Sequence, residues 1–199
     1  MAEVTANGAP LKGKRVAILA TDGFEESELL EPRRALDGAG ASTVVIGPKA
    51  GSIKGWSRGN WGQSVAVDLT LDKAQADDYD ALLLPGGVMN PDRLRTDKSA
   101  VAFVRAFFDS EKPVAAICHA PMMLIEAEVL RDRTLTSWPS LQTDIRNAGG
   151  RWIDEEVVVD RGLVTSRKPD DIPAFNEKMI EAIAEDAPSA RMDRGGAGI

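Results

Sequence analysis

Short apolar runs alternate with amphipathic stretches along most of the chain. The runs have the length of buried strands, and they occupy residues 15–20, 42–46, 79–84, 114–117, 134–137, 156–160 and 163–166. Helical spacing is clearest in the stretches at 25–36, 97–110, 141–148 and from 170 or 171 to about 185. Because strands alternate with helices, we predict an α/β fold, a three-layer sandwich with a flavodoxin-like, mostly parallel sheet and helices on both faces.

One region departs from this alternation. Residues 47–62 are rich in glycine and contain Trp56 and Trp61, which predicts a small hairpin leading to a strand at 64–68. We expect the two tryptophans to serve packing or subunit contact. A stacking platform for single-stranded nucleic acid is the weaker alternative, because such platforms lie in basic grooves and this chain has a formal net charge of −7.

The length of 199 residues suits a single domain with a full core. We predict a flexible N-terminal arm over residues 1–10, one domain over 11–186 and a disordered tail over 187–199. No apolar stretch is long enough to span a bilayer, and the N-terminus lacks the basic and apolar blocks of a signal peptide. We therefore expect a cytoplasmic protein with neither a membrane nor a nucleic acid as its partner.

The chain has one cysteine and one histidine, and they are neighbours, Cys118 and His119. A single cysteine excludes an internal disulfide, and this pair argues against a zinc site of the usual ligands. A lone cysteine is more often a small buried side chain than a nucleophile. The surroundings of Cys118 nevertheless favour the second role, because a strand precedes it, Pro121 suits the first position of a helix, and the small residues Ala116 and Ala120 flank it. This pattern predicts a nucleophile elbow with the sulfur at a helix N-terminus, where a thiolate is favoured.

The predicted sheet brings further candidates to this cysteine. In a flavodoxin-like order the first, third and fourth strands are neighbours, so the loops 21–26, 85–92 and 118–121 meet at their carboxyl ends. The first loop and the helix start after it carry four acids, Asp22, Glu25, Glu26 and Glu28, of which one can face the sulfur as a protonated carboxyl if it is buried. Gly86, Gly87 and the backbone near His119 are candidates for an oxyanion pocket, although a plain turn explains the glycine pair equally well.

The chain resembles the PfpI family of the ThiJ/PfpI superfamily, which is related to class I glutamine amidotransferases. The resemblance extends from about Lys14 to Glu185. The segments that carry it are Gly23-Phe24-Glu25-Glu26-Ser27-Glu28, Leu84-Pro85-Gly86-Gly87, Asn90-Pro91-Asp92-Arg93-Leu94-Arg95, Ala116-Ile117-Cys118-His119-Ala120-Pro121, Thr136-Ser137-Trp138 and Thr165-Ser166-Arg167-Lys168-Pro169-Asp170-Asp171.

This resemblance implies roles for individual residues. Cys118 is the nucleophile, His119 its base or orienting partner, and Glu25, which follows Gly-Phe, the acid against the sulfur. In family members described as peptidases a neighbouring subunit supplies a further acid, and Asp92 falls at that position. The resemblance thus implies a homo-oligomer, a homodimer or larger, with Asp92 near the subunit interface. Asp92 is an aspartate where some relatives have glutamate, so its reach to His119 is shorter.

The resemblance also limits the possible activities. The first hypothesis is a stress-response thiol enzyme without a cofactor, a glyoxalase-like or deglycase-like hydrolase that acts on reactive carbonyls. The second hypothesis is an intracellular cysteine peptidase. A third is a redox-sensing or chaperone-like stress protein, in which Cys118 is oxidised to the sulfinate. Glutamine amidotransferase activity is not expected, because the chain has no histidine downstream of its His119.

Overall fold

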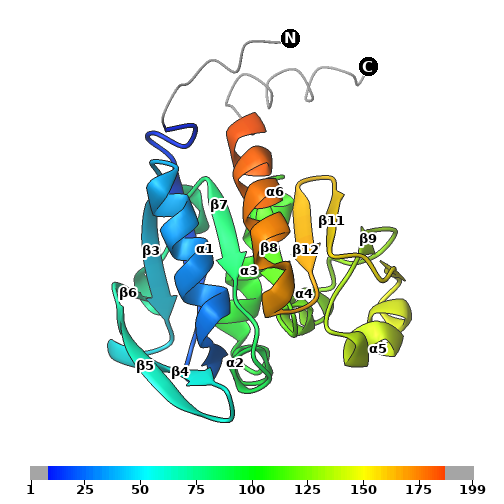
Figure 1. Ribbon diagram of the computed structural model, residues 1–199, viewed down its shortest axis with the longest axis horizontal. Helices are drawn as coiled ribbons and strands as arrows, with labels where there is room; N and C mark the ends of the chain where they lie inside the picture. Colours follow the sequence, from blue (N-terminus) through cyan, green and yellow to red (C-terminus); the bar gives the residue numbers. More distant parts are fainter. Residues whose placement is uncertain (1–8, 187–199) are drawn as a thin grey trace.

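The computed structural model describes residues 9–186, and its centre is a seven-stranded sheet in the order β11-β12-β8-β7-β1-β3-β6 (Figure 1). All neighbours in it are parallel except β11 and β12. The strands of this sheet are β1 (Arg15–Leu19), β3 (Ser42–Gly47), β6 (Leu69–Thr70), β7 (Ala81–Leu84), β8 (Val114–Ile117), β11 (Val157–Asp160) and β12 (Leu163–Ser166). The predicted alternation of strands and helices is therefore confirmed.

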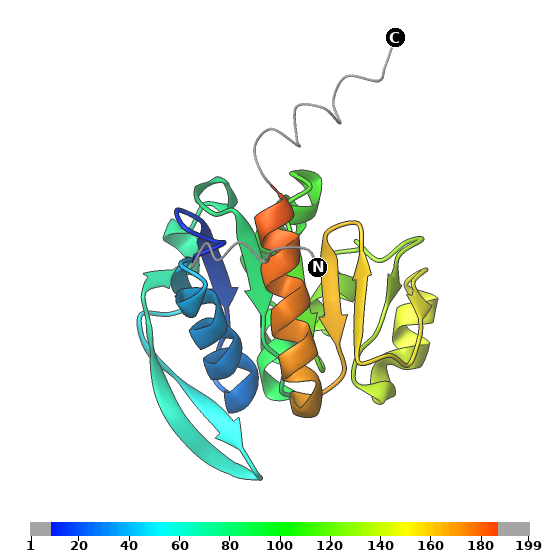
Figure 2. The same ribbon diagram turned by 45° about the horizontal axis from the view of Figure 1, so that its top comes forward.

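Helices cover both faces of this sheet. They are α1 (Glu26–Gly38), α2 (Met89–Leu94), α3 (Lys98–Asp109), α4 (Pro121–Glu126), α5 (Gln142–Asn147) and α6 (Ile172–Glu185), with 3-10 turns η1 (Leu71–Lys73), η2 (Ala76–Asp78), η3 (Pro139–Leu141) and η4 (Pro169–Asp171). The helices α1 and α6 lie side by side on one face (Figures 1 and 2), whereas α3 and α4 pack on the other. The result is the predicted three-layer sandwich.

Local sequence explains why the elements begin where they do. The strands β7 and β8 are buried along their whole length, as expected of central strands covered on both faces. The helix α3 is capped by Asp97, whose carboxylate accepts hydrogen bonds from the backbone N–H groups of Ser99 and Ala100. The helix α4 starts at Pro121, which occupies the first helical turn, as predicted.

The excursion after β3 is a hairpin of β4 (Gly51–Ser57) and β5 (Asn60–Val67). Trp56 and Trp61 pack edge to face across it, with ring centroids 5.3 Å apart. The hairpin is longer than predicted, because residues 64–67 belong to its second strand. It projects from the main sheet (Figure 2) and pairs through β4 with β2 (Phe24–Glu25), so Glu25 is extended rather than helical.

A second difference concerns the strand predicted at 134–137. The structure has only β9 (Thr134–Leu135) there, and it pairs with β10 (Arg151–Trp152) outside the main sheet. Within residues 9–186 no helix is long and apolar enough to cross a membrane. Most of the predicted N-terminal arm, and all of the predicted tail, lie outside the described residues.

Candidate active site

The candidate site lies at the carboxyl ends of three neighbouring strands. β7 pairs in parallel with β1 on one side and with β8 on the other. The loops that leave these strands therefore meet at one edge of the sheet, as predicted. This edge brings together Glu28 at the start of α1, the Gly86-Gly87 pair and Cys118.

Cys118 occupies a strained turn between β8 and α4. Its φ is 63°, in the left-handed region that residues with a side chain rarely adopt. Backbone hydrogen bonds hold it there: its N–H donates to the Ser166 carbonyl at 3.0 Å, and its own carbonyl accepts from the N–H of Trp138 at 2.9 Å. This is the geometry of the predicted nucleophile elbow, and the residue is only 6% exposed.

The acid beside the sulfur is Glu28, in the first turn of α1. It is fully buried, and its Oε2 accepts a hydrogen bond of 2.9 Å from the N–H of Gly86. The carboxyl also interacts directly with the Cys118 side chain. Burial, reinforced by the charge of Glu25, raises the pKa of Glu28 to about 8. At pH 7 this carboxyl is therefore mostly protonated and can donate a hydrogen bond toward the sulfur.

Glu25 does not hold the position that the resemblance assigned to it. It precedes α1 in extended β2, is only half-buried, and pairs its side chain with Ser27. The reason is helical phase, because the inward face of α1 contains Glu28, Leu29, Pro32 and Leu36. The sequence contained a signal for this choice, because Glu28 is the acid that shares a helix face with the apolar positions Leu29, Pro32 and Leu36.

The other acids of the first loop brace the hairpin instead. Asp22 accepts from the backbone N–H of Lys54 at 2.7 Å, and Glu26 accepts from Gln63. Neither contributes to the buried site around Cys118.

Both glycines were predicted to contribute to an oxyanion pocket, but their N–H groups have different partners. The N–H of Gly86 is directed to Glu28, so it is not free for an oxyanion. The N–H groups of Gly87 and His119 interact with the sulfur itself. A side chain on Gly86 would meet Glu28, Ile117 and Cys118 at 2.6–2.8 Å, and Gly87 has a φ of 75°. Close approach and backbone conformation thus both require glycine here.

Opposing effects act on the thiol of Cys118. Burial raises its pKa, and the charge of Glu28, when that residue is ionised, raises it further. Hydrogen bonds from the Gly87 and His119 N–H groups lower the pKa. The raising effects are the larger, so the pKa of the thiol lies above its ordinary value. At neutral pH, where Glu28 is mostly protonated, its carboxyl can donate a hydrogen bond that stabilises a thiolate formed during reaction.

His119 is in contact with the sulfur, at 3.2 Å from its Nδ1 to Sγ. Its ring stacks on Trp138 with centroids 5.6 Å apart, and its Nε2 lies 3.5 Å from the hydroxyl of Ser140. Burial lowers the pKa of His119, so the imidazole is neutral at pH 7. Trp138, which is 39% exposed, and Ser140 lie beside the site, and sequence reasoning assigned no role to either.

Asp92 lies apart from this group. It is exposed on α2, and within residues 9–186 no hydrogen bond or ion pair joins it to His119. Its participation from a neighbouring subunit stays a prediction. Among the same residues, no group of three or more His, Cys, Asp or Glu side chains could hold a metal ion.

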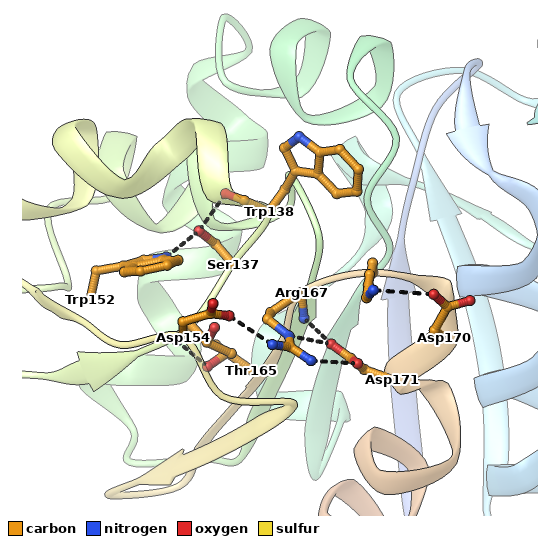
Figure 3. A network of polar contacts seen from close by, with 10 residues as sticks. Ser137, Trp138, Trp152, Asp154, Thr165, Arg167, Asp170 and Asp171 are labelled. Atoms are coloured by element: carbon orange, nitrogen blue, oxygen red, sulfur yellow. Dashed lines mark hydrogen bonds and ion pairs between the residues drawn. The ribbon is translucent and has the colours of Figure 1, made fainter.

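A polar network supports the elbow from the side of β12 (Figure 3). Arg167 follows Ser166, and its guanidinium binds Asp171 at 2.9 and 3.1 Å and Asp154 at 2.7 Å. Asp171 also accepts from the backbone N–H of Arg167 at 3.1 Å. Asp171 precedes α6, as predicted, but its carboxylate binds Arg167 instead of capping the helix. The network thereby fixes the strand end whose carbonyl holds Cys118.

We expect Asp171→Ala to lower the free energy of unfolding by about 3 kcal/mol, because it leaves the half-buried Arg167 with only Asp154 as partner. The matched control is Asp170→Ala, whose side chain is 81% exposed and pairs with Lys168 on the surface. That control should change stability by less than about 0.5 kcal/mol. Urea unfolding of both variants tests this, and equal effects would contradict a structural role of the network.

Stability should also depend on pH through Glu28. Its carboxyl is protonated in the folded chain up to about pH 8, whereas in the unfolded chain it ionises near its ordinary pKa of 4.5. The unfolded state therefore binds fewer protons in this window, and Glu28 makes folding less favourable as pH rises, by up to about 5 kcal/mol. Urea unfolding across the window should show this loss in the wild type and not in Glu28→Gln. Parallel stability profiles would disprove the assignment.

The fold and the site together define a class, α/β proteins with a cysteine on a nucleophile elbow. Within it, the chain belongs to the DJ-1/PfpI family, whose sequence profile matches residues 14–182. The resemblance found in the sequence is thus confirmed over nearly the whole described part of the chain.

Individual relatives are similar over almost their full length. Protein/nucleic acid deglycase 2 of Escherichia coli K12 is 44% identical over 171 residues, which are 85% of this chain and 98% of the relative. YraA of Bacillus subtilis, named as a candidate cysteine protease, is 41% identical over 170 residues, again 85% of this chain and 98% of the relative. The crystal structure of Drosophila melanogaster DJ-1beta superposes with a TM-score of 0.78 at 28% identity and covers 92% of this chain and 96% of its own.

Proposed function

We propose that this protein is a thiol enzyme that needs no cofactor and acts on reactive carbonyl compounds, as a glyoxalase or deglycase. The observation that carries the proposal is the buried, protonated Glu28 against the sulfur of Cys118. A carboxylic acid in that position can stabilise a thiolate and can also return a proton to an oxygen bonded to the attacked carbon. The E. coli relative that is named a deglycase supports this reading.

The chemistry follows from these groups. The thiolate of Cys118 adds to an aldehyde carbon, so a C–S bond forms and the carbonyl electron pair moves to oxygen, which takes a proton from Glu28. The N–H groups of Gly87 and His119, which interact with the sulfur, are the donors that we assign to the developing charge on this oxygen. With an α-oxoaldehyde, transfer of the C–H proton to the adjacent carbonyl carbon oxidises one carbon and reduces the other. Water then releases a hydroxy acid and restores the thiol, so no external oxidant is consumed.

A cysteine peptidase is the second candidate, and the 3.2 Å contact between His119 and Cys118 favours it. A peptidase also needs an acid to orient its histidine. Among residues 9–186 the hydrogen-bonding group beside the Nε2 of His119 is the Ser140 hydroxyl, and no acid lies there. The acid would have to be Asp92 from a second copy in a homo-oligomer. The name of the Bacillus relative supports this alternative.

One assay separates the candidates. Purified protein is incubated with methylglyoxal and, in parallel, with an unstructured peptide, while both lactate and peptide fragments are measured. The carbonyl enzyme predicts lactate formation without fragments, and this rate should be the same in Asp92→Ala. Peptide cleavage that disappears in Asp92→Ala would favour the peptidase. If neither substrate reacts while mild peroxide adds two oxygens to Cys118, the redox sensor replaces both.

A further inference from the structure

The buried side chain of Asn90 connects two loops of the site. Asn90 lies in α2, is only 1% exposed, and reaches back under the loop that follows β7. Its Oδ1 accepts from the N–H of Thr21 at 2.8 Å, and its Nδ2 donates to the carbonyls of Pro85 at 2.8 Å and Gly86 at 3.2 Å. The loops after β1 and β7 are therefore joined through one amide.

Those two carbonyls belong to the peptide units that face the reactive pair. The unit between Pro85 and Gly86 has its carbonyl on Asn90 and its N–H on Glu28 at 2.9 Å. The unit between Gly86 and Gly87 has its carbonyl on Asn90, and its N–H interacts with Cys118. In each of these two peptide units, Asn90 therefore binds the carbonyl, while the N–H on the opposite edge of the unit is directed at Glu28 or Cys118.

Such a restraint is needed because this segment is Gly-Gly. Glycine occupies positive and negative φ about equally well, so the backbone of Gly86 and Gly87 by itself does little to prevent either peptide plane from rotating. Such a rotation would turn a carbonyl oxygen toward the sulfur or toward Glu28, where an N–H now stands. Besides Asn90, the carbonyl of Gly86 accepts only a longer bond of 3.3 Å from the N–H of Glu25 among the described residues.

We propose that Asn90 is a positioning residue of this site, whose amide keeps both glycine N–H groups directed at Glu28 and Cys118. Only an amide meets the requirement, since the position needs one acceptor for Thr21 and two donors for the carbonyls. The inference rests on one part of the proposed function, namely that the sulfur of Cys118 is the reacting atom.

The test measures the thiol itself and not turnover. Cys118 is the one cysteine of the chain, so the rate of its alkylation by iodoacetamide, followed by mass spectrometry, reports its thiolate alone. Two variants are compared with the wild type across pH. Asn90→Asp keeps the oxygen for Thr21 and loses the donors, and Asn90→Leu has similar volume without a charge. Asn147→Asp, exposed at the end of α5, is the matched control.

In both Asn90 variants we expect alkylation near neutral pH to be about tenfold slower, with its pH midpoint raised by about one unit. The direction follows because the Gly87 N–H that favours the thiolate is no longer held in place. The control should keep the wild-type profile.

A merely structural role would lower the melting temperature of the Asn90 variants and leave the pH midpoint of alkylation unchanged, and that result overturns the proposal. If Asn90→Leu does not fold, the smaller uncharged variant Asn90→Ala takes its place, because the carboxylate of Asn90→Asp could raise the midpoint by its charge alone. Failure of the wild type to consume methylglyoxal would affect the proposed function and leave this test intact.

Discussion

Cys118→Ser is expected to reduce methylglyoxal consumption by at least about 10³-fold. A serine hydroxyl is a far weaker nucleophile at neutral pH than a thiol, and the protonated Glu28 beside it cannot act as its base. The neutral His119 is the remaining proton acceptor, and its Nδ1 lies 3.2 Å from the sulfur. The measurement is lactate formation by wild type and variant at equal concentration.

The serine variant should remain folded, because the exchange is nearly isosteric and the backbone bonds to Ser166 and Trp138 do not depend on the sulfur. Its melting curve is the control for this. A folded Cys118→Ser protein with wild-type turnover would show that the carbonyl chemistry occurs elsewhere in the molecule.

Glu28→Gln should have the second-largest effect, a loss of about 10² to 10³-fold in kcat with methylglyoxal. The glutamine amide retains an oxygen for the N–H of Gly86 and has no acidic proton to transfer. The wild-type rate should itself fall above about pH 8, where Glu28 ionises, because it then has no proton to transfer and its charge opposes formation of the Cys118 thiolate. Glu28→Gln should lack that limb of the profile.

Glu25→Gln is the matched control, since it is the same change three positions earlier, at the half-buried residue that precedes α1. We expect its turnover to stay within about threefold of the wild type. Because the charge of Glu25 raises the pKa of Glu28, its removal should move the alkaline limb to slightly lower pH. A large loss in Glu25→Gln with little loss in Glu28→Gln would return the acid role to Glu25.

The elbow could be predicted because its determinants are local. Strand residues, small neighbours and Pro121 all stand within a few positions of Cys118, and the structure confirms the turn they indicate. The order of the central strands also followed from the alternation of elements, which is why the three loops could be placed together.

The choice of acid could not be read in the same way. It depends on the rotation of α1, and that rotation is set by the pairing of Phe24 and Glu25 with the hairpin strand β4. The apolar positions Leu29, Pro32 and Leu36 indicate which face of α1 is buried, but the contact that fixes this rotation joins residues far apart in the sequence. The separate roles of Gly86 and Gly87 depend likewise on Asn90 and Glu28, which approach the loop from two different helices.

The bond between the N–H of Cys118 and the carbonyl of Ser166 has a consequence for synthesis of the chain. During translation the cysteine leaves the ribosome well before β12, so the left-handed turn has no partner strand at first. Until Ser166 and the Arg167–Asp171 pair arrive, nothing in this network shields the sulfur or fixes its geometry. The backbone geometry of the reactive residue is therefore completed only when β12, which lies 48 positions further along the chain at Ser166, has been synthesised and has paired with β8.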